Sequence, residues 1–478
     1  MINFKRYGKC CLSLFLAASM ILMPSVQTFA EEETAAATTD STQTEGEDRE
    51  TQRQKCYAIA PDSNSVENWP QGPATYADSA IVMDMNSGAV LYSKQIEKKH
   101  YPASITKLLT TLVALDNAEL TDTVEFSQDS ISFLEYGDAH IGMTPGEQIS
   151  MEDALYAVLL ASANEVSYAV AESVGKKMGG GYDTFIQAMN DESEKLGCTG
   201  SHWTNANGLH DEQHYTTAHD MARIGAAVYQ KEAFRTISQS LSHTIPVTNL
   251  VNEERTFQQK HKMLWPQNDN YYEYCKGGKT GYTDQARTTL VTMADNGDMQ
   301  LVAVVLYDFG NDAYIDTRAM FDYAYSNFSK ISLKDQKLPE GVKSYEDEDA
   351  YIVLPKSAQF SDVKAEVKED SNKDGSGTVT FTYKGQEVGS VKAAIEKTEE
   401  SSAAVLGKKK DKTTSTVVTG ISKFMKIVIG VVIAVVILLI IIVVLANYRK
   451  QIRRRRRKKG KRRNAKSGNV KRKKKRRR

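Results

Sequence analysis

Residues 427–446 form an uninterrupted run of twenty uncharged, apolar side chains. A helix rises 1.5 Å per residue, so this run would reach about 30 Å, the thickness of a bilayer core. It therefore predicts one transmembrane helix. Residues 449–478 then contain 21 lysines and arginines and no acidic residue. Basic residues beside a span favour the cytoplasmic side, so we expect the chain before the span to lie on the external face of a cell membrane.

The other end of the chain has the pattern of a cleavable secretory signal over residues 1–30. Lys5, Arg6 and Lys9 come first, residues 10–22 are apolar, and a small residue ends the segment at Ala30. An uncleaved anchor is the alternative, but the apolar stretch is short for a membrane span. We expect no lipid anchor, because Cys10 and Cys11 open the apolar stretch.

Charge divides sharply along the chain. Residues 31–448 carry 37 basic and 60 acidic side chains, a net charge of −23, while the tail is purely basic. Such a tail could bind nucleic acid. It is better explained as a stop-transfer signal that holds anionic lipid, so we expect a membrane partner and no nucleic acid.

The remaining chain divides by composition and by the spacing of its apolar residues. Residues 31–74 are acidic and predicted to be disordered, residues 75–330 to form the main folded domain, and residues 331–396 a small β-rich domain. A linker over 397–426 leads to the span, and the basic tail covers 447–478.

Terminal strands around a helical middle predict an α+β fold, an antiparallel sheet with helices packed on it. Two strands are expected at 79–84 and 89–93 around Asn86-Ser87-Gly88, and two at 288–294 and 300–307 around Asn296-Gly297. Helices are expected at 104–116, from the N-cap Ser150 to about 160, then to about 177, and at 313–327. Short strands at 351–354, 363–367, 378–383 and 388–392 would form the second domain.

Three short motifs in the main domain carry chemistry: Ser104-Ile-Thr-Lys107, Ser162-Ala-Asn164 and Lys279-Thr280-Gly281. Spacing alone does not identify the catalytic serine. The pattern Ser-x-x-Lys recurs at 173–176 and 361–364, and Ser-x-Asn recurs at 467–469 in the tail. The setting of Ser104 is distinctive, because Pro102 precedes it and an apolar helical run follows it.

On a helix, Ser104 and Lys107 share one face, so the amine can reach the hydroxyl. A serine needs a base beside it, and lysine can serve if its neutral form is favoured. A serine at a helix start also meets free backbone N–H groups that can stabilise an oxyanion. Lys279 and Thr280 offer a cation and a hydroxyl to a substrate carboxylate, and Gly281 lets a substrate backbone approach. Alternatively, both residues have only structural roles: Ser104 caps a helix, and Lys279 lies in a turn that leads into a strand.

In order and setting the three motifs resemble those of the serine D-alanyl-D-alanine carboxypeptidases, the low-molecular-mass penicillin-binding proteins. Nearby phrases agree: Ser79-Ala-Ile-Val-Met-Asp84, Tyr101-Pro-Ala-Ser104, Asn207-Gly-Leu-His210 and His214-Tyr-Thr-Thr-Ala218. The resemblance covers about residues 75–330, and more loosely the β-rich domain. It implies a β-lactamase/transpeptidase-like catalytic domain.

The resemblance also implies a role for each residue. Ser104 would be the acylated nucleophile, Lys107 its general base, and Ser162 the relay of a proton to the leaving amine. The substrate-binding residues would be Asn164, Lys279, Thr280, Gly281 and Tyr282, with the N–H groups of Ser104 and Tyr282 as the oxyanion hole. The implied substrate is a peptidoglycan stem peptide ending in D-Ala-D-Ala, with β-lactams as covalent inhibitors and no cofactor.

Some features depart from the pattern or stay open. Ala163 stands where many members have Gly or Asp. Some members place an arginine before the last helix, where this chain has Asn311-Asp312; Arg287 or Arg318 could substitute. Cys56, Cys198 and Cys275 allow at most one disulfide. The histidines His210, His214 and His219 fit no zinc signature, so we expect no metal.

Two other functions compete with this interpretation. A β-lactamase would need a glutamate to activate the deacylating water, and neither Glu192 nor Glu194 lies in the expected pattern. A β-lactam or wall-peptide sensor would explain the long tail. A sensor need not retain both Lys107 and Lys279.

Overall fold

The structure is a computed structural model that describes residues 48–370 and 375–396. Its centre is a five-stranded antiparallel sheet in the order β2-β1-β9-β8-β7, so the predicted α+β class is confirmed. The strands are β1 (Ser79–Asp84), β2 (Val90–Lys94), β7 (Cys275–Thr283), β8 (Arg287–Asp295) and β9 (Gln300–Asp308). Both predicted hairpins are present, β1–β2 and β8–β9. The first and last strands of the domain therefore meet in one sheet, with β7 at its edge.

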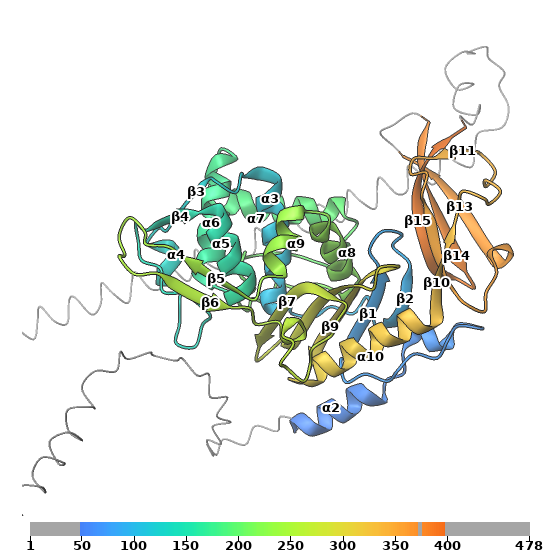
Figure 1. Cartoon of the computed structure of the whole chain (residues 1–478), viewed down its shortest axis with the longest axis horizontal. Helices are drawn as coiled ribbons and strands as arrows, with labels where there is room; N and C mark the ends of the chain where they lie inside the picture. The colour runs from blue at the N-terminus through green and yellow to red at the C-terminus, as the bar shows by residue number, and fades with distance from the viewer. Residues whose placement is uncertain (1–47, 371–374, 397–478) are drawn as a thin grey trace, which may run out of the picture. The chain divides into compact units, whose positions relative to one another are not determined.

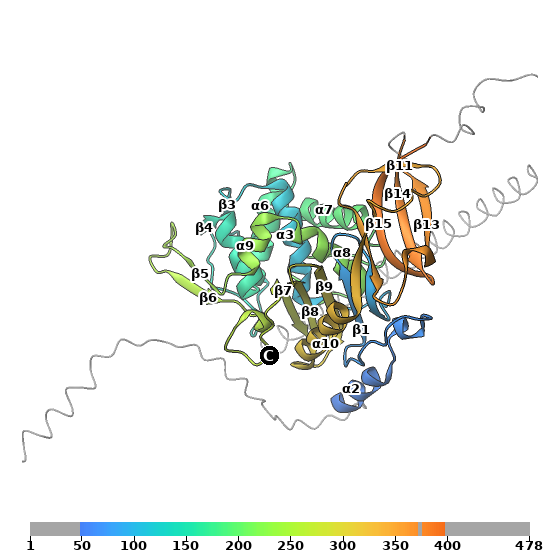
Figure 2. The ribbon, with the colours of Figure 1, turned by 45° about the vertical axis from the view of Figure 1, so that its right-hand side comes forward.

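Helices cover both faces of this sheet, which is why its inner strands β1, β9 and β8 carry apolar side chains on both sides. On β1, Ile81 and Met83 join a hydrophobic cluster with the helical middle of the chain, whereas Ala80 and Val82 join another with α10. Figures 1 and 2 show α10 along one face, with α3 and α8 on the other. The helices are α3 (Lys107–Asn117), α5 (Met151–Tyr156), α6 (Asn164–Lys177), α7 (Tyr182–Lys195), α8 (Ala218–Tyr229), α9 (Glu232–Ser238) and α10 (Asp312–Asn327).

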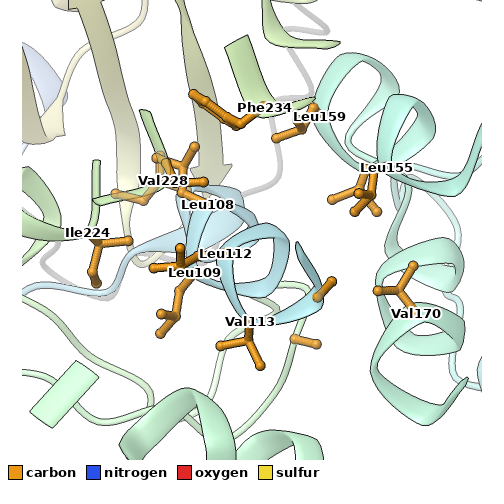
Figure 3. Close-up of a cluster of buried hydrophobic side chains, with 14 of the residues drawn as sticks. Leu108, Leu109, Leu112, Val113, Leu155, Leu159, Val170, Ile224, Val228 and Phe234 are labelled. Carbon is orange, nitrogen blue, oxygen red and sulfur yellow. The ribbon is translucent and has the colours of Figure 1, made fainter. Parts of the chain in front are cut away.

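Helix α3 lies at the centre of the first cluster. Its first eight residues are buried, and Figure 3 shows Leu108 and Leu112 beside side chains of α8, with Leu155 and Val170 approaching from α5 and α6. Burying a leucine side chain stabilises a fold by about 1.5–3 kcal/mol. Packing from several sides therefore fixes the helix that carries Lys107 at its first turn.

Shorter elements connect these layers. They are α4 (Asp129–Ser132), a π-helix (Ala157–Ala161), and the two-stranded pairs β3 (Thr123–Glu125) with β4 (Gln148–Ser150) and β5 (Ser242–Ile245) with β6 (Arg255–Gln258). The predicted N-cap at Ser150 is confirmed, since its side chain accepts a hydrogen bond from the Asp153 N–H at 3.1 Å. The helix that it starts changes to the π form at Ala157.

The chain after α10 is built of strands, as its alternating pattern predicted. β10 (Phe328–Ser332) pairs with β12 (Tyr351–Pro355), and β11 (Val342–Tyr345), β15 (Gln386–Ile395), β14 (Ser376–Tyr383) and β13 (Val363–Glu369) form a second sheet in that order. Side chains of these strands belong to the same hydrophobic cluster as one face of the central sheet. The hydroxyl of Tyr351 also donates to Asp84 at 3.1 Å.

The predicted disorder over 31–74 is wrong for residues 48–74. Helix α2 (Arg49–Ala58) is formed, and Arg53 of this helix pairs with Asp312 of α10 at 2.5 Å. Buried Lys94 donates to the Cys56 carbonyl at 2.8 Å, and Trp69 is 4% exposed. These partners are distant in sequence, so the acidic composition of the segment gave no sign of them.

No helix within 48–370 and 375–396 is long and apolar enough to cross a membrane. The predicted signal over 1–30, linker over 397–426, span over 427–446 and basic tail lie outside the described residues. Those predictions stay predictions.

Candidate active site

Ser104 lies in a short 3₁₀ helix, Ala103–Thr106, that leads directly into α3. The predicted helix start is therefore confirmed, with a tighter first turn. Ala103 has φ +51°, a left-handed conformation that is unfavourable for a residue with a side chain. Two hydroxyls hold this turn: Thr106 donates to the Ala103 carbonyl, and Thr289 of β8 donates to the Pro102 carbonyl, both at 2.8 Å. The strained turn presents Ser104 at the edge of the central sheet.

Lys107 is fully buried beneath Ser104. Its Nζ lies 3.0 Å from the Ser104 Oγ, 2.8 Å from the Asn164 Oδ1 and 2.6 Å from the Asn207 carbonyl. Burial lowers the pKa of this amine to about 7, although the nearby Glu165 carboxyl acts in the opposite direction. A substantial neutral fraction is thus available at neutral pH, as a general base requires.

Ser162 ends the π-helix and lies across the site from β7. It adopts the left-handed conformation with φ +61°, a common way for a helix to end. The Lys279 Nζ lies 3.0 Å from the Ser162 Oγ, and Asn164 begins α6 two residues later. The short link between the π-helix and α6 therefore places the Ser162 hydroxyl beside Lys279 and the Asn164 amide beside Lys107.

Strand β7 contributes Lys279 and the backbone that faces Ser104. Lys279 is 1% exposed, and burial lowers its pKa well below the ordinary value, with Lys107 acting in the same direction. A Cβ at Gly281 would lie 2.9 Å from the Ser104 nitrogen, so only glycine permits this approach of strand to nucleophile. Thr280 is half-buried, and Tyr282 is 58% exposed beside the site.

The site residues predicted from the sequence thus surround one centre. Ser104, Lys107 and Asn164 are joined by hydrogen bonds, Ser162 and Lys279 form a second bonded pair, and Thr280, Gly281 and Tyr282 continue the strand from Lys279. The decoy Ser173 lies in α6 and Ser361 in the 3₁₀ turn Phe360–Asp362. Neither is part of the site.

Two further parts of the site were not predicted from the sequence. The loop with Asn207 and Gly208 passes behind the nucleophile, and a Cβ on Gly208 would meet the Ala103 carbonyl oxygen at 1.9 Å. Glu165 is fully buried, and one of its oxygens accepts the Ile141 N–H at 2.7 Å. Asn207 and Gly208 belong to the phrase Asn207-Gly-Leu-His210 quoted above, and Glu165 directly follows Ser162-Ala-Asn164, so these positions were the available signal.

The structure locates the residues that the sequence left open. Arg318 bonds the Tyr271 carbonyl, whereas Arg287 begins β8 opposite Thr283. Among the described residues all three cysteines are free and buried, so the one bridge that the sequence allowed is not formed. Glu192, the glutamate considered for a β-lactamase, pairs with Lys195 at 2.7 Å on α7.

A serine that is hydrogen-bonded to a buried amine, and that lies beside a second hydroxyl and a second buried amine, defines a class of site. It is the site of a serine acyltransferase or hydrolase, in which the serine is transiently acylated.

Comparison with known proteins gives the family. A family model described as D-alanyl-D-alanine carboxypeptidase matches residues 66–310. The D-alanyl-D-alanine carboxypeptidase DacF of Bacillus subtilis is 28% identical over 340 residues, which are 66% of this chain and 80% of that protein. DacB2 of Mycobacterium tuberculosis is 32% identical over 267 residues, 54% of this chain and 84% of that one. A solved D-alanyl-D-alanine carboxypeptidase of Mycobacterium tuberculosis is 31% identical, with a TM-score of 0.48 over 56% of this chain and 96% of that one.

The chain belongs to the D-alanyl-D-alanine carboxypeptidase family. The family resemblance inferred from the three motifs is confirmed.

Proposed function

We propose that this protein is a serine DD-carboxypeptidase that removes the terminal D-alanine from peptidoglycan stem peptides ending in D-Ala-D-Ala. One observation carries the proposal: the buried Lys107 Nζ lies 3.0 Å from the Ser104 Oγ. The family match and the names of the curated relatives support the reaction.

Acylation follows from the groups around Ser104. Neutral Lys107 takes the hydroxyl proton while the Ser104 oxygen attacks the carbonyl carbon of the penultimate D-alanine. The backbone N–H groups of Ser104 and Tyr282 stabilise the oxyanion. Collapse breaks the peptide bond, and Ser162 passes a proton to the departing amine of the last D-alanine. Water then hydrolyses the ester on Ser104 and releases the shortened peptide.

Substrate selection rests on the terminal carboxylate. Lys279 supplies the cation and Thr280 a hydroxyl, while Asn164 orients the peptide backbone. A β-lactam also carries a carboxylate beside a strained amide, so it acylates Ser104 by the same steps. The amine released by ring opening stays attached to the acyl group, so the β-lactam remains covalently bound to Ser104. The protein is therefore a penicillin-binding protein.

The proposed setting is the external face of the cell membrane. Its support is the sequence alone: a signal over 1–30, an apolar run over 427–446 and a basic tail. This placement puts Ser104 on the side where peptidoglycan lies.

The test is D-alanine release from a peptide ending in D-Ala-D-Ala by the full-length protein. Ser104→Ala should lower the rate by at least about 10³-fold, as expected when a nucleophile is removed. Ser173→Ala, which removes a serine of the same Ser-x-x-Lys spacing on α6, should leave the rate unchanged. Penicillin labelling without D-alanine release would support the sensor instead, and rapid repeated penicillin hydrolysis would support a β-lactamase.

A further inference from the structure

The small β-sheet that follows α10 ends at strand β13, which has one free edge. Within the described part of the chain its only neighbouring strand is β14, and Figure 2 shows β13 at the border of the sheet. The pairing with β14 is regular over all seven residues of β13. The opposite edge strand, β11, has only four residues and an irregular pairing, two features that protect an edge from further pairing. β13 has neither feature.

The backbone of β13 directs alternate residues toward β14 and away from it. At the end of the strand the Asp370 N–H donates to the Ser376 carbonyl at 3.0 Å. Hydrogen bonds in an antiparallel pair alternate along each strand, so the even-numbered residues bond to β14. The N–H and C=O groups of Val363, Ala365 and Val367 therefore point to the free edge.

The side chains of β13 divide between the two faces of the sheet. Val363 and Val367 are half-buried and pack against the hydrophobic cluster of this domain. Lys364, Glu366 and Lys368 lie on the other face and are exposed. None of these three charges forms a salt bridge within 48–370 and 375–396. The free edge thus combines open backbone groups with a row of alternating charges.

A strand that joins this edge must suit both its backbone and its charges. A second β13 that runs antiparallel meets both conditions when Ala365 lies opposite its own copy on a two-fold axis. Lys364 then lies opposite Glu366 twice, and Val363 lies opposite Val367 twice. The backbone groups at the free edge of one copy also meet those of the other, because odd-numbered residues face odd-numbered residues.

The charges favour this register over its neighbours. Moving the axis to Lys364 or to Glu366 places that residue opposite its own copy, so that like charges repel. Moving the axis to Val367 places Val363 opposite a residue beyond the end of the strand and removes the valine contacts. The axis at Ala365 is the one of these four that gives opposite charges and paired valines together.

We propose that two copies of this chain associate through β13, antiparallel about Ala365, so that their small β-sheets join into one continuous sheet. The partner is a second copy because the charge pattern of the strand complements its own reversed sequence. The association does not depend on the proposed reaction, since no residue of the site around Ser104 takes part in it.

Ala365→Cys tests this contact in the purified full-length protein, oxidised mildly with copper phenanthroline. Residues that face each other as a hydrogen-bonded pair have Cα atoms about 5.5 Å apart, within the range of a disulfide. We expect a disulfide-linked dimer on a non-reducing gel. Ser344→Cys, exposed on the opposite edge strand β11, should give a yield at least about tenfold lower. Equal yields from the two variants, or no dimer above that of the unaltered protein, would overturn the proposal.

Charge exchange in the Ala365→Cys protein provides the second test. Glu366→Lys or Lys364→Glu places like charges opposite each other twice per dimer and should lower the yield by about tenfold. The variant that carries both changes has opposite charges again and should recover the yield. Both positions are exposed, and circular dichroism checks the folding of each variant. Single variants with an unchanged yield, or a double variant that forms no more dimer than they do, would overturn the proposal.

Discussion

Lys107 and Lys279 are two buried amines in one small site, and the proposed reaction needs them in opposite protonation states. Burial lowers both pKa values, which suits Lys107 as a base. Lys279 must be cationic when it binds the substrate. An arriving carboxylate raises the pKa of Lys279 and so favours the cationic form.

The rate of acylation of Ser104 should depend on pH. Because burial lowers the pKa of Lys107 to about 7, the base is mostly protonated at pH 6 and mostly neutral at pH 8. The second-order rate of labelling by a fluorescent penicillin should therefore rise about tenfold per pH unit below 7 and then level off. A rate that is flat or falls between pH 6 and 8 would exclude Lys107 as the base. Labelling rates from pH 5.5 to 8.5 provide the measurement.

At the scale of elements, the site depends on how closely the loop at Gly208 packs behind the nucleophile. Gly208 has φ +85°, and an added Cβ would overlap the Ala103 carbonyl. Gly297, in the β8–β9 turn, has a matching φ of +88° but open space around it. Alanine substitutions at the two positions therefore distinguish the free-energy cost of the backbone conformation, which both share, from the effect of displacing Ser104, which only Gly208→Ala has.

Gly208→Ala should therefore lower the rate of D-alanine release by at least about tenfold, since a shift of the nucleophile by a fraction of an ångström disturbs a reactive geometry. Gly297→Ala carries the same conformational cost of about 1–2 kcal/mol but should keep the full rate. Rates are compared on folded protein, with circular dichroism as the check. Equal activity of the two variants would mean that close packing behind Ser104 is unimportant.

The sequence predicted the elements well where the signals are local. Turn residues at Asn86 and Asn296 marked both hairpins, and Ser150 marked a helix start, because each acts on neighbours in the chain. Contacts between distant segments were not predictable in this way. Arg53 with Asp312, and Lys94 with the Cys56 carbonyl, order residues that looked unable to fold. In the site, the close approach of Gly208 to Ala103 was not predictable for the same reason.

At the scale of the whole molecule, the fold buries ionisable groups whose protonation makes the free energy of unfolding depend on pH. His261 is 1% exposed and bonds Thr292, and burial lowers the pKa of its ring to about 3 from the ordinary value of 6.5. Between about pH 6.5 and pH 3, the His261 ring therefore binds a proton in the unfolded chain but stays neutral in the folded protein. The resulting stability is present above pH 6.5 and is lost as the pH falls toward 3.

His261→Gln should consequently reduce the slope of unfolding free energy against pH by about 1.4 kcal/mol per pH unit between pH 4 and 6. Urea titrations of the variant and of the unaltered protein at several pH values measure the two slopes. A slope unaffected by His261→Gln would show that the ring is already charged in the folded protein.

Three motifs widely separated in sequence meet at Ser104, and the proposed reaction requires that this one serine be acylated. The most direct measurement is mass spectrometry of the full-length protein after reaction with penicillin, followed by peptide mapping. We predict a single penicilloyl adduct on the peptide that contains Ser104, and no adduct in Ser104→Ala. An adduct on another residue, or one that persists in Ser104→Ala, would contradict the proposed reaction.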